Sequence, residues 1–314
     1  MDVVVMGTPD FAVPTLKRLI DSPSHRVNAV VTQPDKPKGR GKQMLYPPVK
    51  ECALAHHIPV LQPARIKDGD FIEQLRAVPA DVFVVAAYGQ ILPEAVLYMP
   101  RYGSLCVHGS LLPKYRGAAP IQWAVADGEA ETGVTIMQMD KGIDTGDILL
   151  QKAFPILPED TGADVHDKMA EIGADALLEA LALLEEGKLV PIKQDDAQSS
   201  YAKMLTRDSG LICWAKPAKD IINLIRAFNP WPSAYTTYEG ETIKIWRAEG
   251  ISGFEDQNRL PGEILAVIKN AGFVVKTADG ALLVTEVQGM GGKKMRAADY
   301  LRGHDMETGK ILGL

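Results

Sequence analysis

Short apolar runs alternate with segments of helical spacing through the first part of the chain. The runs are rich in valine and lie at residues 3–6, 27–31, 82–86, 105–108 and 134–139. The helical segments lie between them, at residues 12–21, 49–56, 71–76 and 121–127. Continuous β-branched runs suit strands buried on both faces, and strand–helix alternation is typical of a parallel sheet covered by helices. We therefore expect an α/β fold with a doubly wound sheet.

The pattern changes after a long predicted helix. Residues 163–186 repeat apolar side chains at three- and four-residue spacing, with Thr161 able to cap the start and Gly187 able to end the helix. Residues 189–206 are polar and lack periodicity, so we expect a linker there. The predicted first domain accordingly covers residues 1–188.

A second domain is expected at residues 207–314. Its segment 218–228 has helical spacing, and turn residues at 239–240, 270–272 and 279–280 separate short apolar runs. Such spacing is typical of hairpins in a small β-barrel. The specific prediction is a barrel of OB type.

Composition restricts the class of protein. The 314 residues carry a net charge of −6, so the surface as a whole does not indicate nucleic-acid binding. Cys52, Cys106 and Cys213 are too few and too scattered for a disulfide framework, which favours free thiols in a reducing cytoplasm. The first residues lack the basic region of a signal peptide, and no apolar run approaches the ~20 residues of a membrane span. We expect a cytoplasmic protein without a membrane partner.

Two loops carry candidate catalytic residues. His108 ends an apolar run and precedes a loop rich in glycine and proline, and Asp144 lies in the glycine-rich acidic loop 140–147. Histidine titrates near neutral pH, and a carboxylate can hold it in one tautomer and strengthen it as a base. The pair suits proton transfer, although a turn histidine and an unrelated surface loop would give the same pattern.

A third loop, at residues 86–93, follows a probable central strand. Ligands of open parallel sheets bind outside the carboxyl ends of the strands, so this loop could converge with the His108 and Asp144 loops on one crevice. Its apolar side chains and backbone amides would suit a flat heteroaromatic ring. The first strand–helix turn has only Gly7 of the dinucleotide fingerprint, which argues against NAD. Cys52, His56 and His57 lack further partners at ligand spacing, so no metal site is predicted.

Two basic clusters stand out against the acidic total. Each could be a solvated charge run, but together they favour a nucleic-acid partner. The cluster in the first domain consists of Lys36, Lys38, Arg40 and Lys42, and the cluster in the second consists of Lys293, Lys294, Arg296 and Arg302.

Several segments together carry a resemblance to a known family. They are Gly7-Thr8-Pro9-Asp10-Phe11-Ala12, Thr32-Gln33-Pro34-Asp35, Gly39-Arg40-Gly41-Lys42, His108-Gly109-Ser110-Leu111-Leu112-Pro113, Arg116-Gly117-Ala118-Ala119-Pro120 and the loop 140–147. Along nearly its whole length the chain resembles the methionyl-tRNA formyltransferases, a branch of the 10-formyltetrahydrofolate-dependent formyltransferases. The resemblance implies a Rossmann-like catalytic domain, a linker and a C-terminal OB-type domain that binds tRNA.

The same resemblance implies ligands and roles. It implies His108 and Asp144 as catalytic residues, a tRNA acceptor end held by the Arg40 loop and the second domain, and no metal and no NAD. The expected substrates are 10-formyltetrahydrofolate and charged initiator tRNA, and the expected state is a monomer. The implied folate-binding residues are Ser110, Leu111, Leu112, Pro113, Tyr88, Gly89, Gln90, Ile91 and Leu92.

Cys106 stands where the family pattern has asparagine. Residues two apart in a strand share a face, so Cys106 and His108 are both expected to look into the site. The thiol could replace the amide as an oxyanion donor, fill space, or act as a nucleophile that carries the formyl group.

The expected reaction moves a formyl group to the α-amino group of methionine on initiator tRNA, which supports translation initiation. Alternatives are the same transfer to a purine precursor or amino sugar, hydrolysis that releases formate, and a binding module disabled at Cys106.

Overall fold

The structure is a computed structural model that describes residues 1–38, 43–254 and 258–313. The chain divides into two compact units, each described by itself. Unit 1 comprises Met1–Pro120, Glu131–Pro155 and His166–Ala202, and unit 2 comprises Ile121–Ala130, Ile156–Val165 and Lys203–Leu314. Unit 2 therefore takes in two short excursions from the first part of the sequence, and residues 189–202 of the predicted linker belong to unit 1.

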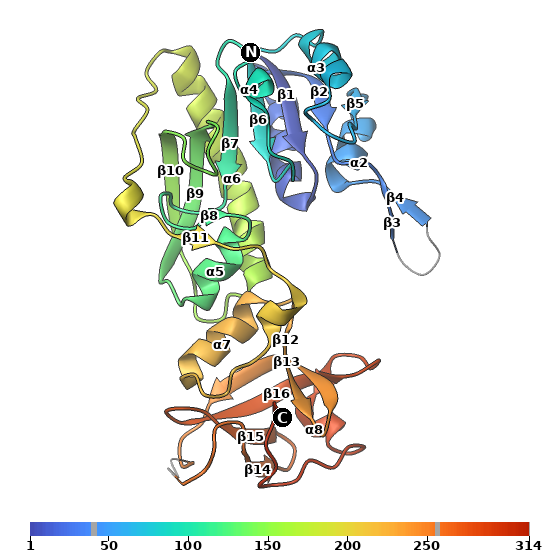
Figure 1. The fold of residues 1–314 in the computed structure, drawn as a ribbon, viewed down its shortest axis with the longest axis vertical. Helices are drawn as coiled ribbons and strands as arrows, with labels where there is room; N and C mark the ends of the chain where they lie inside the picture. The colour runs from blue at the N-terminus through green and yellow to red at the C-terminus, as the bar shows by residue number, and fades with distance from the viewer. Residues whose placement is uncertain (39–42, 255–257, 314) are drawn as a thin grey trace. The chain divides into compact units, whose positions relative to one another are not determined.

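The core of unit 1 is a seven-stranded sheet in the order β10-β9-β7-β6-β1-β2-β5 (Figure 1). Its strands are β1 (Asp2–Gly7), β2 (Arg26–Val31), β5 (Val60–Leu61), β6 (Val82–Ala86), β7 (Ser104–His108), β9 (Glu131–Gln138) and β10 (Ile148–Pro155). The helices of unit 1 are η1 (Asp10–Ala12), α1 (Val13–Asp21), α2 (Pro48–Ala55), α3 (Gly69–Arg76), α4 (Glu94–Leu97) and most of α6 (Gly162–Glu185). Helix α5 (Pro120–Ala126) belongs to unit 2 from Ile121 onward, as does the start of α6 as far as Val165. The predicted strand–helix alternation is thus confirmed, and the fold is Rossmann-like.

The sheet is mixed rather than wholly parallel. Strands β7, β6, β1, β2 and β5 run parallel, but β9 runs antiparallel to both β7 and β10. A run that is buried on both faces records no direction, so residues 134–139 could not reveal this reversal. Strand β10 lies at the sheet edge with side chains that are mostly half-buried or exposed, and its pattern of Ile, Leu, Gln and Lys gave no strand signal.

Apolar packing holds the sheet to its helices. Val4, Met6, Phe83 and Val85 are buried on one face with residues of α3 such as Leu75. Helix α6 begins as predicted, because the Asp164 carboxylate accepts hydrogen bonds from the Thr161 amide and hydroxyl. Gly187, with φ of 65°, follows the end of the helix.

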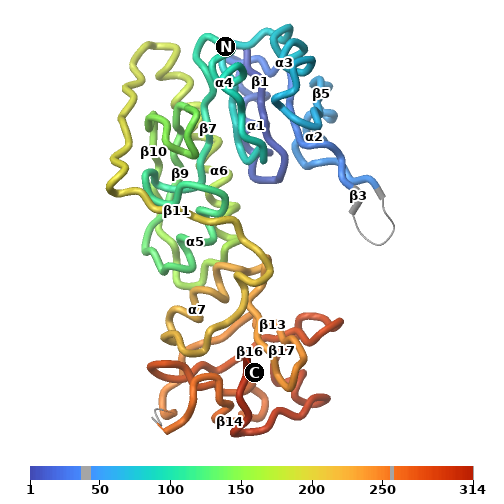
Figure 2. The backbone as a smooth tube through the Cα atoms, viewed as in Figure 1, coloured from blue at the N-terminus to red at the C-terminus, as the bar shows by residue number. Residues whose placement is uncertain are grey.

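Smaller elements complete unit 1. They are the strand pair β3 (Lys36–Lys38) and β4 (Gln43–Leu45), the parallel pair β8 (Arg116–Gly117) and β11 (Tyr201–Ala202), and helix η2 (Asp196–Gln198). In Figure 2 the chain after α6 runs past β10 to β11. The segment predicted as a linker thus returns to the sheet region before it enters unit 2.

Unit 2 is built on an antiparallel sheet in the order β12-β13-β16-β15-β14, with β17 on β16. The elements are η3 (Arg207–Gly210), α7 (Ala218–Ala227), β12 (Ala234–Tyr238), β13 (Glu241–Gly250), β14 (Ile264–Ile268), β15 (Gly272–Lys276), β16 (Ala281–Gly289), β17 (Met295–Arg296) and α8 (Ala297–Tyr300). The turn at Glu239 and Gly240 has positive φ at both residues, which is the hairpin geometry expected there.

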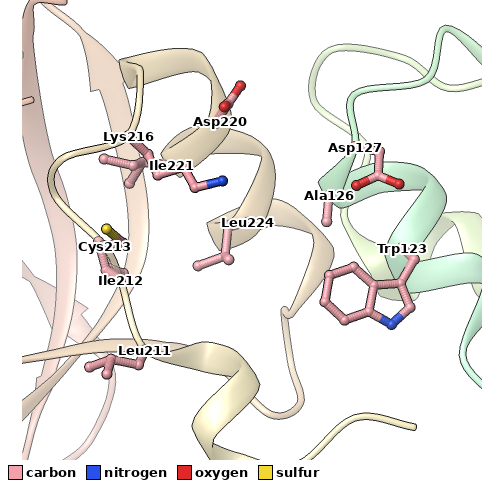
Figure 3. A pocket seen from close by; sticks show the side chains of 10 residues that line it. All are labelled: Trp123, Ala126, Asp127, Leu211, Ile212, Cys213, Lys216, Asp220, Ile221 and Leu224. Atoms are coloured by element: carbon pink, nitrogen blue, oxygen red, sulfur yellow. The ribbon is translucent and has the colours of Figure 1, made fainter. Parts of the chain in front are cut away.

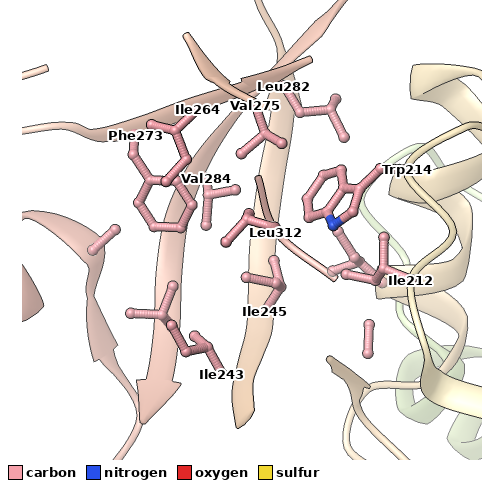
Figure 4. Packing of buried hydrophobic residues seen from close by; sticks show 14 of the residues in the cluster. Ile212, Trp214, Ile243, Ile245, Ile264, Phe273, Val275, Leu282, Val284 and Leu312 are labelled. Carbon is pink, nitrogen blue, oxygen red and sulfur yellow. The ribbon is translucent and has the colours of Figure 1, made fainter. Parts of the chain in front are cut away.

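One apolar cluster forms the core of unit 2 (Figure 4). Phe273, Val284 and Ile245 from the sheet are buried in it, together with Trp214, whose indole nitrogen donates to the Thr236 hydroxyl at 3.0 Å. A buried indole with a satisfied N–H stabilises the core without leaving an unpaired donor. No helix in the described ranges has both the length and the apolar content needed to cross a membrane.

Gly133 tests how closely β9 and β10 approach. A Cβ atom there would meet the Lys152 carbonyl oxygen and the Leu111 side chain, so Gly133→Ala should lower the free energy of unfolding by about 1–3 kcal/mol. Thermal unfolding measures the change. Gly69→Ala is the control, because its Cβ at the start of α3 would meet nothing within 4 Å. Equal stability of both variants would contradict the tight packing of this strand pair.

Candidate active site

His108 and Asp144 lie together in unit 1. His108 is the last residue of β7, and its Nδ1 is 3.7 Å from Oδ2 of Asp144. The two side chains are only 7% and 18% exposed. The predicted pairing of these residues is therefore present, at ion-pair rather than hydrogen-bond distance.

Both members of the pair have a second partner. His108 Nε2 lies 3.0 Å from the carbonyl oxygen of Tyr115, to which a protonated Nε2 would donate. Oδ2 of Asp144 accepts a hydrogen bond from the Gly117 amide at 2.7 Å. Both ring nitrogens of His108 thus face an oxygen atom, Oδ2 of Asp144 and the carbonyl oxygen of Tyr115. A ring nitrogen reaches a substrate only after one of these contacts opens.

Thr135 on β9 anchors the loop that follows His108. Its hydroxyl donates to the Ser110 carbonyl at 2.7 Å and accepts from the Leu112 amide at 3.1 Å. The Ser110 hydroxyl donates to the Lys114 carbonyl at 2.7 Å. The backbone of residues 110–113 is therefore rigidly held, with Leu112 buried and the Leu112–Pro113 bond cis.

A pocket of about 200 Å³ joins the loop after β6 to the Asp144 loop. Its lining combines methionine, leucine and isoleucine side chains with residues of the acidic loop. The lining residues are Gln90, Ile91, Leu92, Leu97, Met137, Met139, Asp140, Lys141, Gly142, Ile143 and Asp144. Two of the three predicted loops thus converge on one pocket, and Asp144 connects that pocket to His108.

Tyr88 and Gly89 of the same loop have other surroundings. The Tyr88 ring is buried in the core beside the sheet, and desolvation raises its pKa to about 12. Its backbone oxygen accepts hydrogen bonds from the Thr8 hydroxyl and from the side-chain amide of Gln33. Tyr88 therefore anchors the start of the loop, while residues 90–92 line the pocket.

Cys106 packs on the same small cluster as the pocket wall. It contacts the group formed by Leu112, Met137 and Ile148. Burial raises the pKa of the Cys106 thiol, and the charge of Asp144 raises it further. The thiol is therefore neutral at physiological pH.

Three cations of the second-domain cluster are exposed but already form ion pairs with acidic residues of unit 2. Lys294 pairs with Glu286 at 2.7 Å, and Arg296 and Arg302 both pair with Asp299, at 2.9 and 3.3 Å. The Arg296 guanidinium holds the pKa of Asp299 below its usual range. Lys293 is exposed.

The first-domain cluster begins on β3, where Lys36 is exposed and Lys38 is the last residue. Arg40 and Lys42 lie outside the described residues. Asp35, before β3, binds Lys50 at 2.6 Å and Gln62 at 2.8 Å, so it anchors the base of the pair.

Unit 2 has a pocket of its own (Figure 3). It holds about 380 Å³ and is lined by Trp123 of α5, Leu224 of α7 and residues of the segment before α7, including Lys216. None of the predicted site residues lines it. Within the described part of the chain no group of three or more His, Cys, Asp and Glu side chains could hold a metal.

Sequence reasoning missed two contributors to the site. Thr135 lies in a predicted buried strand and had no predicted role, and Gly117 contributes a backbone amide, which every residue except proline could supply. Arg116 is buried and binds Asp196 at 2.7 Å, although it was noted only within a motif. The sequence signal available in this region was an arginine directly before a glycine, and the structure shows that this arginine is buried.

Comparison with known proteins identifies the family of the chain and proteins of similar fold. The family model described as formyl transferase matches residues 1–181, and the model described as formyl transferase, C-terminal domain, matches residues 204–305. An N-formyltransferase from Helicobacter canadensis, crystallised with folinic acid and dTDP-3-aminofucose, has a TM-score of 0.66 at 21% identity. That match covers 93% of this chain and 99% of the other, and it shows a shared fold.

Curated relatives match along the whole chain. The methionyl-tRNA formyltransferase of Lachnospira eligens is 49% identical over 316 residues, covering 100% of both chains. The methionyl-tRNA formyltransferase of Caldanaerobacter subterraneus subsp. tengcongensis is 49% identical over 313 residues, covering 99% of this chain and 100% of the other. The chain therefore belongs to the formyl transferase family and, within it, to the methionyl-tRNA formyltransferases.

Proposed function

We propose that the chain transfers the formyl group of 10-formyltetrahydrofolate to the α-amino group of methionyl initiator tRNA, in support of translation initiation. One observation carries the proposal: the His108–Asp144 pair adjoins a pocket in a chain whose relatives of that name match it over its full length. The folate is a substrate, because it leaves as tetrahydrofolate. The reaction needs neither a metal nor NAD.

The pocket has the properties that the folate would require. Its methionine, leucine and isoleucine side chains suit the face of a flat heteroaromatic ring, and Gln90 and Asp140 offer polar atoms at its border. We assign folate binding to residues 90–92 directly, and to Tyr88 and Gly89 as the base of that loop. Ser110, Leu111, Leu112 and Pro113 would act from the neighbouring loop, whose backbone Thr135 holds in place.

Proton transfer is the chemical task of the pair. The ammonium group of methionine must lose a proton before its nitrogen attacks the formyl carbon. His108 accepts that proton, directly or through water, and donates to the oxygen as negative charge develops on it. The bond from the formyl carbon to the folate nitrogen then breaks, and that nitrogen takes up a proton. Asp144 orients the imidazole and balances its positive charge.

Cys106 faces this chemistry as a neutral group. A thiolate rather than a thiol is the nucleophile, and the raised pKa of Cys106 disfavours that form. The thiol serves either as a weak oxyanion donor or as a filler beside Met137. Backbone amides and His108 then provide most of the stabilisation.

The tRNA would engage both parts of the chain. We assign catalysis to residues 1–188, tRNA binding to an OB-type barrel at residues 207–314, and the connection to residues 189–206. Lys36, Lys38, Arg40 and Lys42 would contact acceptor-stem phosphates. Lys293, Lys294, Arg296 and Arg302 would do so from the second domain, after exchanging acidic partners for phosphate. The protein would work as a monomer in the cytoplasm.

One assay separates this function from its alternatives. The protein is incubated with 10-formyltetrahydrofolate labelled in the formyl carbon, together with initiator tRNA, a purine precursor or an amino sugar. Label on methionyl-tRNA supports the proposal. Label in free formate indicates a hydrolase, label on a small amine indicates a different acceptor, and unchanged folate indicates a binding module.

His108→Ala and Asp144→Asn should each lower kcat by ~10²–10⁴-fold, the usual contribution of general acid–base catalysis. Folate affinity should change little, because neither side chain forms the apolar wall of the pocket. Single-turnover kinetics and equilibrium folate binding measure the two effects. Near-normal turnover of both variants would refute the catalytic assignment.

Cys106→Asn should retain or raise turnover, because an amide is a stronger hydrogen-bond donor than a thiol. Cys106→Ala should fall at or below the parent, with a loss far smaller than the ~10²–10³-fold typical of a full oxyanion donor. Steady-state rates give both values. A formyl-thioester adduct seen by mass spectrometry, with inactive Cys106→Asn, would instead make the thiol a nucleophile.

Arg40→Ala and Lys42→Ala should weaken methionyl-tRNA binding and leave folate affinity unchanged. Binding should also fall steeply with salt, since phosphate contacts release counterions. Filter binding at several salt concentrations measures both effects. Arg76→Ala on α3, whose partner is Glu73, is the matched control. If folate affinity fell and tRNA affinity held, the loop would bind folate.

A further inference from the structure

The segment that follows α6 leaves its apolar side chains exposed and shields a polar one. Its apolar residues Val190 and Ile192 are 73% and 61% exposed. Between positions 191 and 200, all of which are described, Gln194 alone is not exposed. A polar contact rather than apolar packing therefore fixes this segment to unit 1.

Backbone hydrogen bonds tie residues 192–202, the strap segment, to unit 1 at both ends. Ile192 exchanges two hydrogen bonds of 2.8 Å with Ile148 at the start of β10. At the other end the Arg116 amide donates to the Ser200 carbonyl at 2.9 Å, and β11 pairs with β8. The strap segment consequently crosses between the two loops that hold the partners of His108.

The side-chain amide of Gln194 forms hydrogen bonds through both its nitrogen and its oxygen. Its Nε2 donates to the carbonyl oxygens of Asp144 at 2.8 Å and Gly146 at 2.7 Å. Its Oε1 accepts from Nε and Nη2 of Arg116, at 3.0 and 2.9 Å. The side chain therefore joins the Asp144 loop to the residue preceding Gly117, whose amide binds the Asp144 carboxylate.

Ser200 holds the other partner of His108. Its hydroxyl accepts from the Tyr115 amide at 2.8 Å, and the Tyr115 carbonyl is the acceptor facing His108 Nε2. Tyr115 and Asp144 have φ of 59° and 54°, a backbone region that residues other than glycine rarely occupy. Such conformations persist only where neighbouring contacts determine them, and the strap segment supplies those contacts.

The direction of β9 explains why Asp144 needs this support. Because β9 runs antiparallel to β7, the acidic loop begins beside Ser104, whose carbonyl accepts from the Met139 amide at 2.8 Å. His108 lies at the opposite end of β7. The loop must fold back along the strand to bring Asp144 to the imidazole.

We propose that Gln194 is a positioning residue for the formyl transfer, acting through Asp144, and that Ser200 acts likewise through Tyr115. The strap segment is thus part of the active site rather than a passive connection. The inference rests on the proposed catalytic roles of His108 and Asp144.

Gln194→Glu isolates the two donor contacts, because the carboxylate still accepts from Arg116 but faces the Asp144 and Gly146 carbonyls without a donor. We expect kcat to fall about 10- to 100-fold, as small misplacements of catalytic groups do, while KM for each substrate stays within about twofold. Gln198→Ala is the control from the same segment, because Gln198 is exposed and its side chain bonds only Asp195 among the contacts described. It should keep its activity.

A double-mutant cycle distinguishes positioning from loss of structure. In an Asp144→Asn background, Gln194→Glu should lower kcat by less than a further factor of about three, because the effects of coupled residues are not additive. The inference would be overturned if Gln194→Glu lowered kcat by the same factor in the Asp144→Asn background as in the parent. It would also be overturned if Gln194→Glu alone kept the kcat of the parent. Should Gln194→Glu fail to fold in thermal unfolding, Ser200→Ala in the His108→Ala background gives the same test. Failure of the proposed function would appear separately, as normal turnover of His108→Ala itself.

Discussion

The antiparallel pairing of β9 with β7 is the constraint on which the active site depends. It sets Thr135 opposite His108, and the Thr135 hydroxyl then fixes the backbone of the loop after His108. It also sends the acidic loop away at the far end of β7, so Asp144 returns only by folding back. The site is therefore assembled by loops crossing the strand ends, and it does not follow from the edge of a parallel sheet alone.

The side chains of His108 and Asp144 are largely buried. His108 lies between a carbonyl and a carboxylate, Cys106 stays protonated, and methionine, leucine and isoleucine side chains line much of the adjoining pocket. Electrostatic interactions are stronger in partly buried surroundings than in water, so the carboxylate of Asp144 is well placed to orient the His108 side chain.

The two basic clusters differ in how they could meet a polyanion. In unit 2 the pairs with Glu286 and Asp299 cover much of the cationic charge. Exposed pairs of this kind contribute little to stability, so phosphate can replace the acidic partner at small cost.

Local pattern alone determined much of this protein. Continuous apolar runs identified β1, β2, β6, β7 and β9, and Thr161 and Gly187 marked the ends of α6. The residue types of two loops indicated the candidate pair of His108 and Asp144, which the structure brings to 3.7 Å. Those features depend on residue type and on spacing along the chain, and both can be read from a short stretch of sequence. Tertiary structure decided the direction of β9, the burial of Tyr88 and the contacts of Gln194. A buried run reads the same in both directions, and a glutamine in a polar segment gains its partners only when residues some 50 positions away fold against it.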